Sequence, residues 1–217
     1  MPALPEGEYR VFCDMTFKDG LSSTGTTSAR LPAIPGASAG PASMVADPDD
    51  SWTISPAASV PAATTGDAVY HLPQGLQVVW KAHPALRVKQ DAALRFEVRD
   101  SAGHPVDLEP YMGMISHTAI LRADGGVFAH LHPSGNYSMA AQGFFASKMS
   151  IEAGGTSAGA GGMDGMAGMA GMDHSDSGTS SFSIPYEFPS AGNYRIWVQF
   201  KIGGQILTAV FDASVAA

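Results

Sequence analysis

Histidine and methionine cluster in two neighbouring stretches, Tyr-Met-Gly-Met-Ile-Ser-His at 111–117 and Phe-Ala-His-Leu-His-Pro at 128–133. The side chains in these stretches that can bind a metal ion are Met112, Met114, His117, His130 and His132. Imidazole nitrogens accept copper in either oxidation state, and thioether sulfurs favour soft Cu(I). The two stretches therefore predict a copper site that favours Cu(I) and also accepts Cu(II).

The residues between the two stretches predict how the histidines are arranged. Residues 123–126, Ala-Asp-Gly-Gly, are typical of a tight hairpin turn of type I′ centred on Asp-Gly, because this dipeptide adopts the positive φ angles that the turn requires. Counting outward from this turn places His117 opposite His132, with His130 on the same face of the hairpin. Opposed Cβ atoms lie about 5 Å apart, so the imidazoles can share one ion.

Two other hypotheses remain open for this hairpin. Its histidine face also carries Ala119, Leu121 and Phe128, an apolar strip typical of a sandwich core. Histidines at the rim of such a strip are often structural, so a metal-free structural or interaction domain is the second hypothesis. A copper redox enzyme of the superoxide dismutase type is the third, but the chain shows no clear fourth histidine and no disulfide. His71, His83 and His104 lie near turn signals, and we expect them to be surface residues.

A second group of soft ligands lies in the Gly-, Ala- and Ser-rich tract 153–181. Methionine recurs there at every third residue, and the series ends in Met-x-His. Its members are Met163, Met166, Met169, Met172 and His174. Methionine adds hydrophobicity that solvated linkers avoid, so we interpret the tract as a flexible tether that recruits copper. Low complexity without function and partner binding by methionine remain alternatives.

Seven short segments rich in β-branched and aromatic residues predict strands. They are 76–82, 92–98, 116–122, 127–132, 182–188, 194–201 and 205–215. No segment shows a helical period over a full helix length. We therefore predict an all-β protein whose residues 69–217 form an antiparallel Ig-like β-sandwich of about seven strands.

The N-terminal third has a different organisation. Residues 5–12, Pro-Glu-Gly-Glu-Tyr-Arg-Val-Phe, resemble residues 189–197, Pro-Ser-Ala-Gly-Asn-Tyr-Arg-Ile-Trp. Residues 1–31 are therefore predicted to be a β-hairpin, the remnant of an upstream Ig-like repeat, either isolated or docked on the sandwich. The six prolines in residues 32–68 predict a linker. Cys13 lies in the hairpin and is expected to be a small buried side chain.

Composition excludes several classes of function. The 12 Lys and Arg against 20 Asp and Glu give a net charge of −8, which argues against a nucleic-acid partner. No apolar run is long enough to span a membrane, and the N-terminus lacks the features of a signal peptide. The carboxylates and serines show no glycosidase pairing and no nucleophile elbow, so we expect no enzyme.

The two ligand stretches, the Met-rich tract and residues 188–197 together resemble the YtkA-like family of bacterial Ig-like domains. The resemblance covers about residues 70–217, and residues 1–31 look like the tail of a second such domain. It implies a copper-associated, non-enzymatic role, a periplasmic or other extracytoplasmic location, and a copper-handling protein as a partner. The missing signal peptide departs from this pattern and suggests a truncated form of an exported protein.

Overall fold

The computed structural model describes residues 6–19, 21–33, 51, 53, 55–59, 66–82, 84–135 and 179–217. The strands in these ranges are β1 (Gly7–Thr16), β2 (Ser22–Leu31), β3 (Ala68–His71), β4 (Gln77–Trp80), β5 (Asp91–Arg99), β6 (His117–Arg122), β7 (Phe128–Leu131), β8 (Ser181–Glu187), β9 (Gly192–Ile202) and β10 (Gln205–Val215). None of the described segments forms a long apolar helix of the kind that crosses a membrane.

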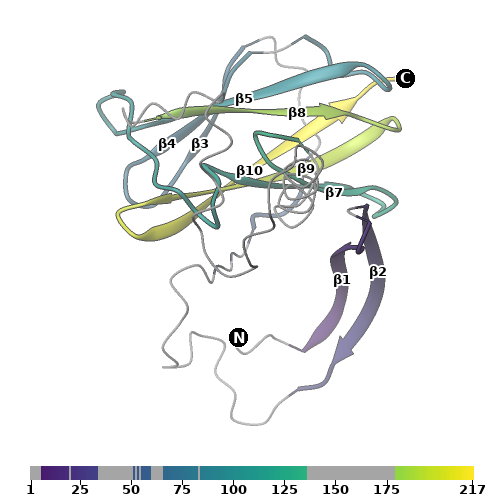
Figure 1. Ribbon diagram of the computed structural model, residues 1–217. Coiled ribbons are helices and arrows are strands. Elements are labelled where there is room, and N and C mark those ends of the chain that lie inside the picture. The colour runs from purple at the N-terminus through teal and green to yellow at the C-terminus, as the bar shows by residue number, and fades with distance from the viewer. Residues whose placement is uncertain are drawn as a thin grey trace, which may run out of the picture.

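Two four-stranded sheets stack face to face (Figure 1). One sheet has the order β10-β9-β6-β7 and the other has the order β3-β4-β5-β8, with every pair of neighbouring strands antiparallel. The Tyr194 hydroxyl donates to the Ser190 carbonyl at 2.6 Å, the tyrosine corner typical of Ig-like sandwiches. The predicted all-β antiparallel sandwich is confirmed. Strand β3 was not predicted, because it has only four residues and begins at Ala68, where the expected linker ends.

Strict alternation along the strands builds the core between the sheets. In β9 every second side chain from Tyr194 to Phe200 is buried, and β5 in the facing sheet alternates in the same way from Leu94 to Val98. In β6 and β7 the core positions are those of Ile120 and Leu131. The fully buried core residues of these four strands are Leu94, Phe96, Val98, Ile120, Leu131, Tyr194, Ile196, Val198 and Phe200. Since successive side chains point to opposite faces, the residues between them must point outward from the sandwich.

The outward face of the β10-β9-β6-β7 sheet is covered by part of the predicted linker. Residues 51, 53 and 55–59 lie along the outward face of the sheet, and hydrogen bonds to side chains hold them. These bonds join Ser51 to Gln199, Ser55 to Trp197, and Pro56 to Arg195. The apolar strip expected in the core, Ala119, Leu121 and Phe128, lies on this outward face instead, because Ile120 and Leu131 occupy the core positions.

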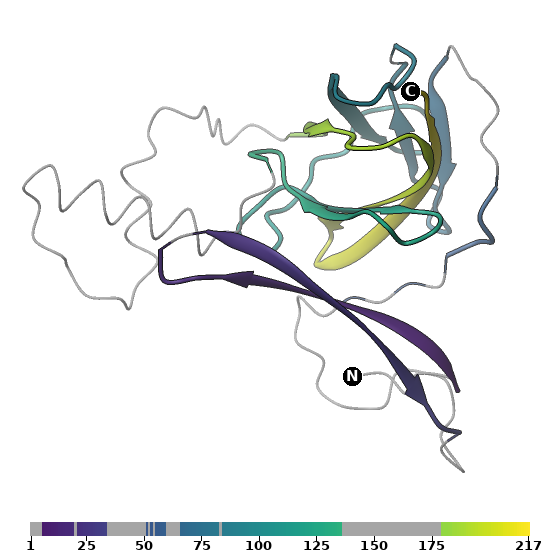
Figure 2. The same ribbon diagram turned by 90° about the vertical axis from the view of Figure 1, so that its right-hand side faces the viewer.

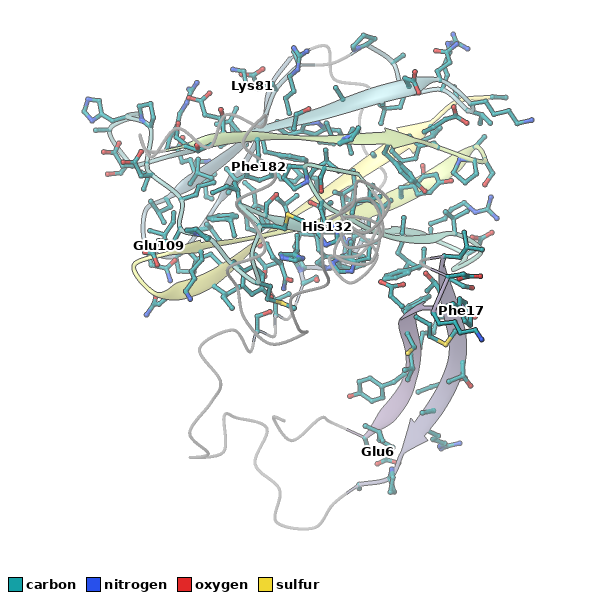
Figure 3. The ribbon with its side chains drawn as sticks, in the orientation of Figure 1. Glu6, Phe17, Lys81, Glu109, His132 and Phe182 are labelled. Atoms are coloured by element: carbon teal, nitrogen blue, oxygen red, sulfur yellow. The ribbon has the colours of Figure 1, made fainter. Side chains whose placement is uncertain are left out.

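The N-terminal hairpin also contacts this outward face, and Figure 2 shows it lying across the outer side of the sheet. The Phe12 ring stacks on Phe128 with centroids 4.0 Å apart and planes 13° from parallel. Arg10 donates to the Asp124 carbonyl at 3.2 Å. Figure 3 marks the two ends of the hairpin with Glu6 and Phe17. Of the two expected arrangements, the structure therefore has the docked one.

The expectation that Cys13 is buried is wrong, because this side chain is exposed. Cys13 lies between Phe12 and Asp14 in β1, and its side chain points to the opposite face of the hairpin from theirs. That face has no core to cover it within the described part of the chain: Val11 is 43% and Met15 40% exposed.

The ion pair between Arg195 and Asp212 ties the outward face of β9 and β10 to the linker, and it predicts a pH dependence. Burial raises the pKa of Asp212, but hydrogen bonds from Arg195 and Ser59 outweigh burial and leave this pKa below its usual value. A lowered pKa in the folded state stabilises the fold above the unfolded-state pKa of about 3.9, and this contribution is lost as the pH falls through the folded-state pKa.

We expect Asp212→Asn to lower the free energy of unfolding at pH 7 by about 1–3 kcal/mol, because it removes the charged partner of a largely buried guanidinium. Urea unfolding between pH 7 and pH 3 measures this. The difference between wild type and variant should shrink below about pH 4. Asp107→Asn, at an exposed position, is the control. A difference that stays constant down to pH 3 would contradict the account.

Candidate metal centre

Strands β6 and β7 bring three histidines together. The register pairs Thr118 with Leu131 and Ala119 with His130. Continuing this register by one residue places His117 opposite His132, as predicted. All three side chains lie on the outward face of the sheet, and each offers one ring nitrogen such that the three atoms lie within 4.8 Å of one another. The three histidines are therefore close enough to hold one metal ion.

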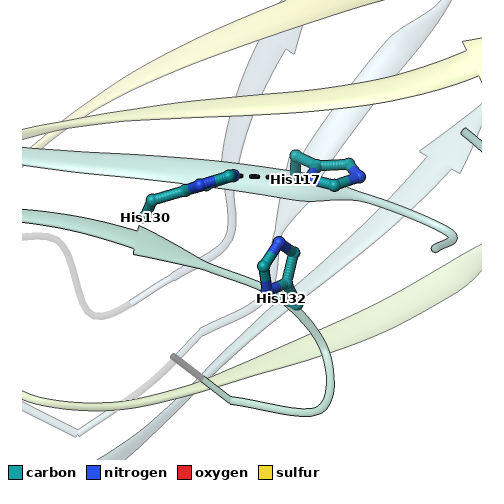
Figure 4. A group of neighbouring side chains, drawn as sticks. All are labelled: His117, His130 and His132. Carbon is teal, nitrogen blue, oxygen red and sulfur yellow. Dashed lines mark hydrogen bonds between the residues drawn. The ribbon is translucent and has the colours of Figure 1, made fainter. Parts of the chain in front are cut away.

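The three rings converge, as Figure 4 shows. The ring centroids are 5.5 Å apart for His117 and His130, 4.8 Å for His117 and His132, and 4.7 Å for His130 and His132. His117 and His132 are only 5% and 4% exposed, whereas His130 is half-buried. The cluster is thus largely shielded from water and opens on the side of His130.

The turn that sets the register differs from the predicted type I′ turn. Gly125 has a positive φ of 76°, but Asp124 is not among the described residues with a positive φ. The Asp124 carboxylate instead accepts hydrogen bonds from the Arg122 side chain and the Gly126 amide, which lower the pKa of Asp124 to about 2. The register survives because Arg122 and Val127 still pair across the turn.

A type I′ turn does form, but at the methionine motif. Tyr111 and Met114 exchange two backbone hydrogen bonds of 2.7 and 3.0 Å around Met112 and Gly113. Both central residues have a positive φ, 47° and 78°. This pattern defines a two-residue type I′ loop. The turn fixes the Tyr111 carbonyl, which accepts a hydrogen bond of 3.0 Å from Nε2 of His117.

Hydrogen bonds on the far side of two rings fix which nitrogens face the centre. A carbonyl can only accept, so His117 carries its proton on Nε2 and its lone pair on Nδ1. The Asp14 carboxylate lies 3.1 Å from Nδ1 of His130, so His130 donates from Nδ1 and carries its lone pair on Nε2. These two remaining atoms, Nδ1 of His117 and Nε2 of His130, lie 3.3 Å apart.

This separation fits a shared ion. Two nitrogens bound to one ion at about 2.0–2.1 Å, with a tetrahedral angle between them, lie about 3.3 Å apart. Histidines that bind metal ions commonly donate their other ring N–H to a carboxylate or a backbone carbonyl, which is the arrangement at His130 and His117. The chemistry of the donor set therefore suits a metal ion that accepts imidazole.

Of the predicted methionine ligands, only Met112 and Met114 lie in the described part of the chain. Met112 is 51% exposed and Met114 is half-buried, and both lie in the turn whose carbonyl holds His117. The other predicted ligands, Met163, Met166, Met169, Met172 and His174, lie outside the described residues. The expected surface positions of His71 and His104 are confirmed, and His83 also lies outside the described residues.

Sequence reasoning missed two groups at the centre. The Tyr111 carbonyl is a backbone group, so its residue type carries no signal. Asp14 is 116 residues from His130 in the sequence, and nothing in its local sequence distinguishes it from other acidic residues. A prediction that the hairpin docks by Phe12 onto Phe128 would have brought Asp14 to His130.

The comparisons with known proteins add a family. Residues 70–217 match the family described as Domain of unknown function (DUF8832). No curated protein and no solved structure matches the chain. The resemblance to the YtkA-like family is not tested by this match and stays a prediction.

We expect Gly113→Ala to lower the free energy of unfolding by about 1–2 kcal/mol, because a side chain at a φ of 78° clashes with the backbone. The variant should also weaken the hydrogen bond from His117 to the Tyr111 carbonyl, seen by NMR as faster exchange of the imidazole N–H. Gly66→Ala, where an added Cβ has no neighbour within 4 Å, is the control. Equal behaviour of the two variants would show that the turn does not orient His117.

Proposed function

The chain belongs to the DUF8832 family, and we propose that it is a copper-binding module for storage, delivery or resistance. His117, His130 and His132 supply nitrogen ligands on the β6–β7 hairpin. Met112 or Met114 completes a soft ligand set, and the residues Met163 to His174 recruit the ion.

One observation carries this proposal: Nδ1 of His117 and Nε2 of His130 face each other across 3.3 Å. Both rings donate their only N–H elsewhere when neutral, to the Tyr111 carbonyl and to Asp14. Nδ1 of His117 and Nε2 of His130 are hydrogen-bond partners at this distance, and a cation that replaces the shared proton would bind both nitrogens. The third ring, His132, stands edge-on to His117 with its centroid 4.8 Å away and lies within reach of the same ion.

The neighbouring thioethers favour copper among the metals that accept imidazole. Zinc is satisfied by three histidines and a water molecule, and it gains little from a thioether. Cu(I) favours soft ligands, and Met112 and Met114 flank Gly113 in the turn that holds His117. Residues 163–174 add four more methionines. This local enrichment in thioethers supports copper.

We further propose that the module holds its ion rather than turning over a substrate, because a soft shell stabilises Cu(I) against oxidation. We propose that the protein is exported and meets copper outside the cytoplasm. We also propose that a copper-handling protein receives its ion. These two points rest on the resemblance to the YtkA-like family.

The direct test is a Cu(I) titration against a competing chelator. We expect tight binding by the wild type and its loss in His130→Ala/His132→Ala, because that variant leaves one imidazole at the centre. His71→Ala/His104→Ala removes two exposed histidines and is the matched control, which should bind like the wild type.

The other outcomes are equally informative. Binding that survives in His130→Ala/His132→Ala would move the copper site to the methionines of residues 163–172. The absence of binding in the wild type would overturn the proposal and leave the metal-free structural domain, with the histidines serving as hydrogen-bonded structural residues.

The identity of the metal is tested by Met112→Leu/Met114→Leu. Leucine keeps the size and apolar character of methionine but has no sulfur. We expect a lower affinity for Cu(I) and an unchanged affinity for Zn²⁺, measured by parallel competition titrations. An unchanged Cu(I) affinity would show that the histidines alone make the site.

A further inference from the structure

We propose that the N-terminal hairpin is part of the metal centre: Asp14 is a positioning residue for His130, and metal binding holds the hairpin in its docked position. This inference rests on the proposed function and extends it to a segment that lies outside the matched family region, residues 70–217.

The first support is the direction of the contact. The Asp14 carboxylate lies 3.1 Å from Nδ1 of His130, on the side of the ring away from the other histidines. The contact keeps a proton on Nδ1 and orients Nε2 toward Nδ1 of His117, 3.3 Å away. A carboxylate behind a ligand histidine also makes the imidazole more basic and fixes its orientation. Asp14 therefore prepares His130 for an ion without binding the ion itself.

The second support is that Asp14 is itself held in place. The register pairs Asp14 with Thr24 on β2, and the Thr24 hydroxyl donates to the other carboxylate oxygen at 2.6 Å. One oxygen of Asp14 thus faces the partner strand of the hairpin and the other faces His130. These two contacts fix the orientation of the Asp14 carboxylate toward His130.

The third support is that Asp14 belongs to one continuous docking face. Arg10, Phe12 and Asp14 are spaced by two residues, so their side chains share one face of β1. All three contact the β6–β7 hairpin: Arg10 at the carbonyl of Asp124, Phe12 on Phe128, and Asp14 at His130. The contacts therefore run along β7, from its turn to the metal centre.

The docked hairpin also shapes the space beside the histidines. A cavity of about 340 Å³ lies between the hairpin, the linker and the outward face of the sheet. His117 and His130 line it from the sheet, Phe12 and Asp14 from the hairpin, and Thr53 from the linker. When the hairpin moves away, the lining residues Phe12 and Asp14 go with it. Docking therefore encloses the half-buried side of the centre.

The docked state is open to regulation by the ion because few contacts maintain it. A two-stranded hairpin is marginally stable by itself, and this hairpin leaves Val11 and Met15 exposed on its far face. Coupling between two events is reciprocal. If Asp14 strengthens metal binding by about 10–100-fold, as outer partners of ligand histidines do, the bound metal strengthens docking by the same factor.

The affinity test compares Asp14→Asn with Glu8→Gln by Cu(I) competition titration. We expect Asp14→Asn to weaken binding about 10–100-fold. Glu8→Gln removes one negative charge from an exposed position of the same strand and should bind like the wild type. Thr24→Val, which removes the hydroxyl that holds Asp14, should weaken binding in the same direction by a smaller factor.

The docking test uses Cys13, the only cysteine of the chain, whose side chain is exposed on the far face of the hairpin. A fluorophore attached to this thiol reports the mobility of the hairpin and blocks the thiol from binding copper. We expect the fluorescence anisotropy to rise when Cu(I) binds to the otherwise unaltered labelled protein, and this rise to be lost in labelled Asp14→Asn. A residue that only stabilised the fold would give no metal-dependent change.

The outcomes separate this inference from the proposed function. Normal binding by Asp14→Asn, together with loss of binding in His130→Ala/His132→Ala, would overturn the role of Asp14 and leave the copper site standing. Equal weakening in Asp14→Asn and Glu8→Gln would reduce the effect to net charge and also overturn the inference. If the wild type binds no copper, the proposed function itself fails.

Discussion

The pairing of β6 with β7 is the constraint on which the rest of this structure depends. Ile120 and Leu131 are completely buried and can fill the core only in the observed register. Because side chains alternate, this register also sends all three histidines to the outward face. A slip by one residue would exchange the faces of one strand and separate His117 from the other two. The packing that stabilises the sandwich thus also assembles the ligand set.

The outward face of the β10-β9-β6-β7 sheet is partly covered by two segments that are remote from it in sequence, the linker and the N-terminal hairpin. Residues 55–59 cover β9 through Ser55 and Pro56, and the hairpin covers β7 through Phe12. Neither segment pairs with the sheet by a backbone ladder in the described part of the chain, and each contact given above involves at least one side chain. The histidine cluster is therefore composite: its three histidines come from the sandwich, and the residues that cover its face of the sheet come from the N-terminal part of the chain.

Alternation and turn chemistry were enough to predict the strands other than β3, the register of β6 and β7, and the meeting of the histidines. They were not enough to tell which face of the β6–β7 hairpin meets the second sheet, since Phe128 looks like a core residue until Phe12 is known to cover it. The turn type at Asp124 was missed because its carboxylate is engaged by Arg122. Asp14 was missed because its role depends on docking, which leaves no local pattern.

The place of each strand in its sheet gives the three histidines unequal freedom. His117 stands on β6, which is hydrogen-bonded to β7 on one side and to β9 on the other. His130 and His132 stand on or directly after β7, a four-residue strand at the edge of the sheet. An edge strand opens locally at a lower cost than a central one. The cluster thus combines one histidine on a central strand with two histidines at an edge strand, so the distances between the three rings can adjust at a low cost.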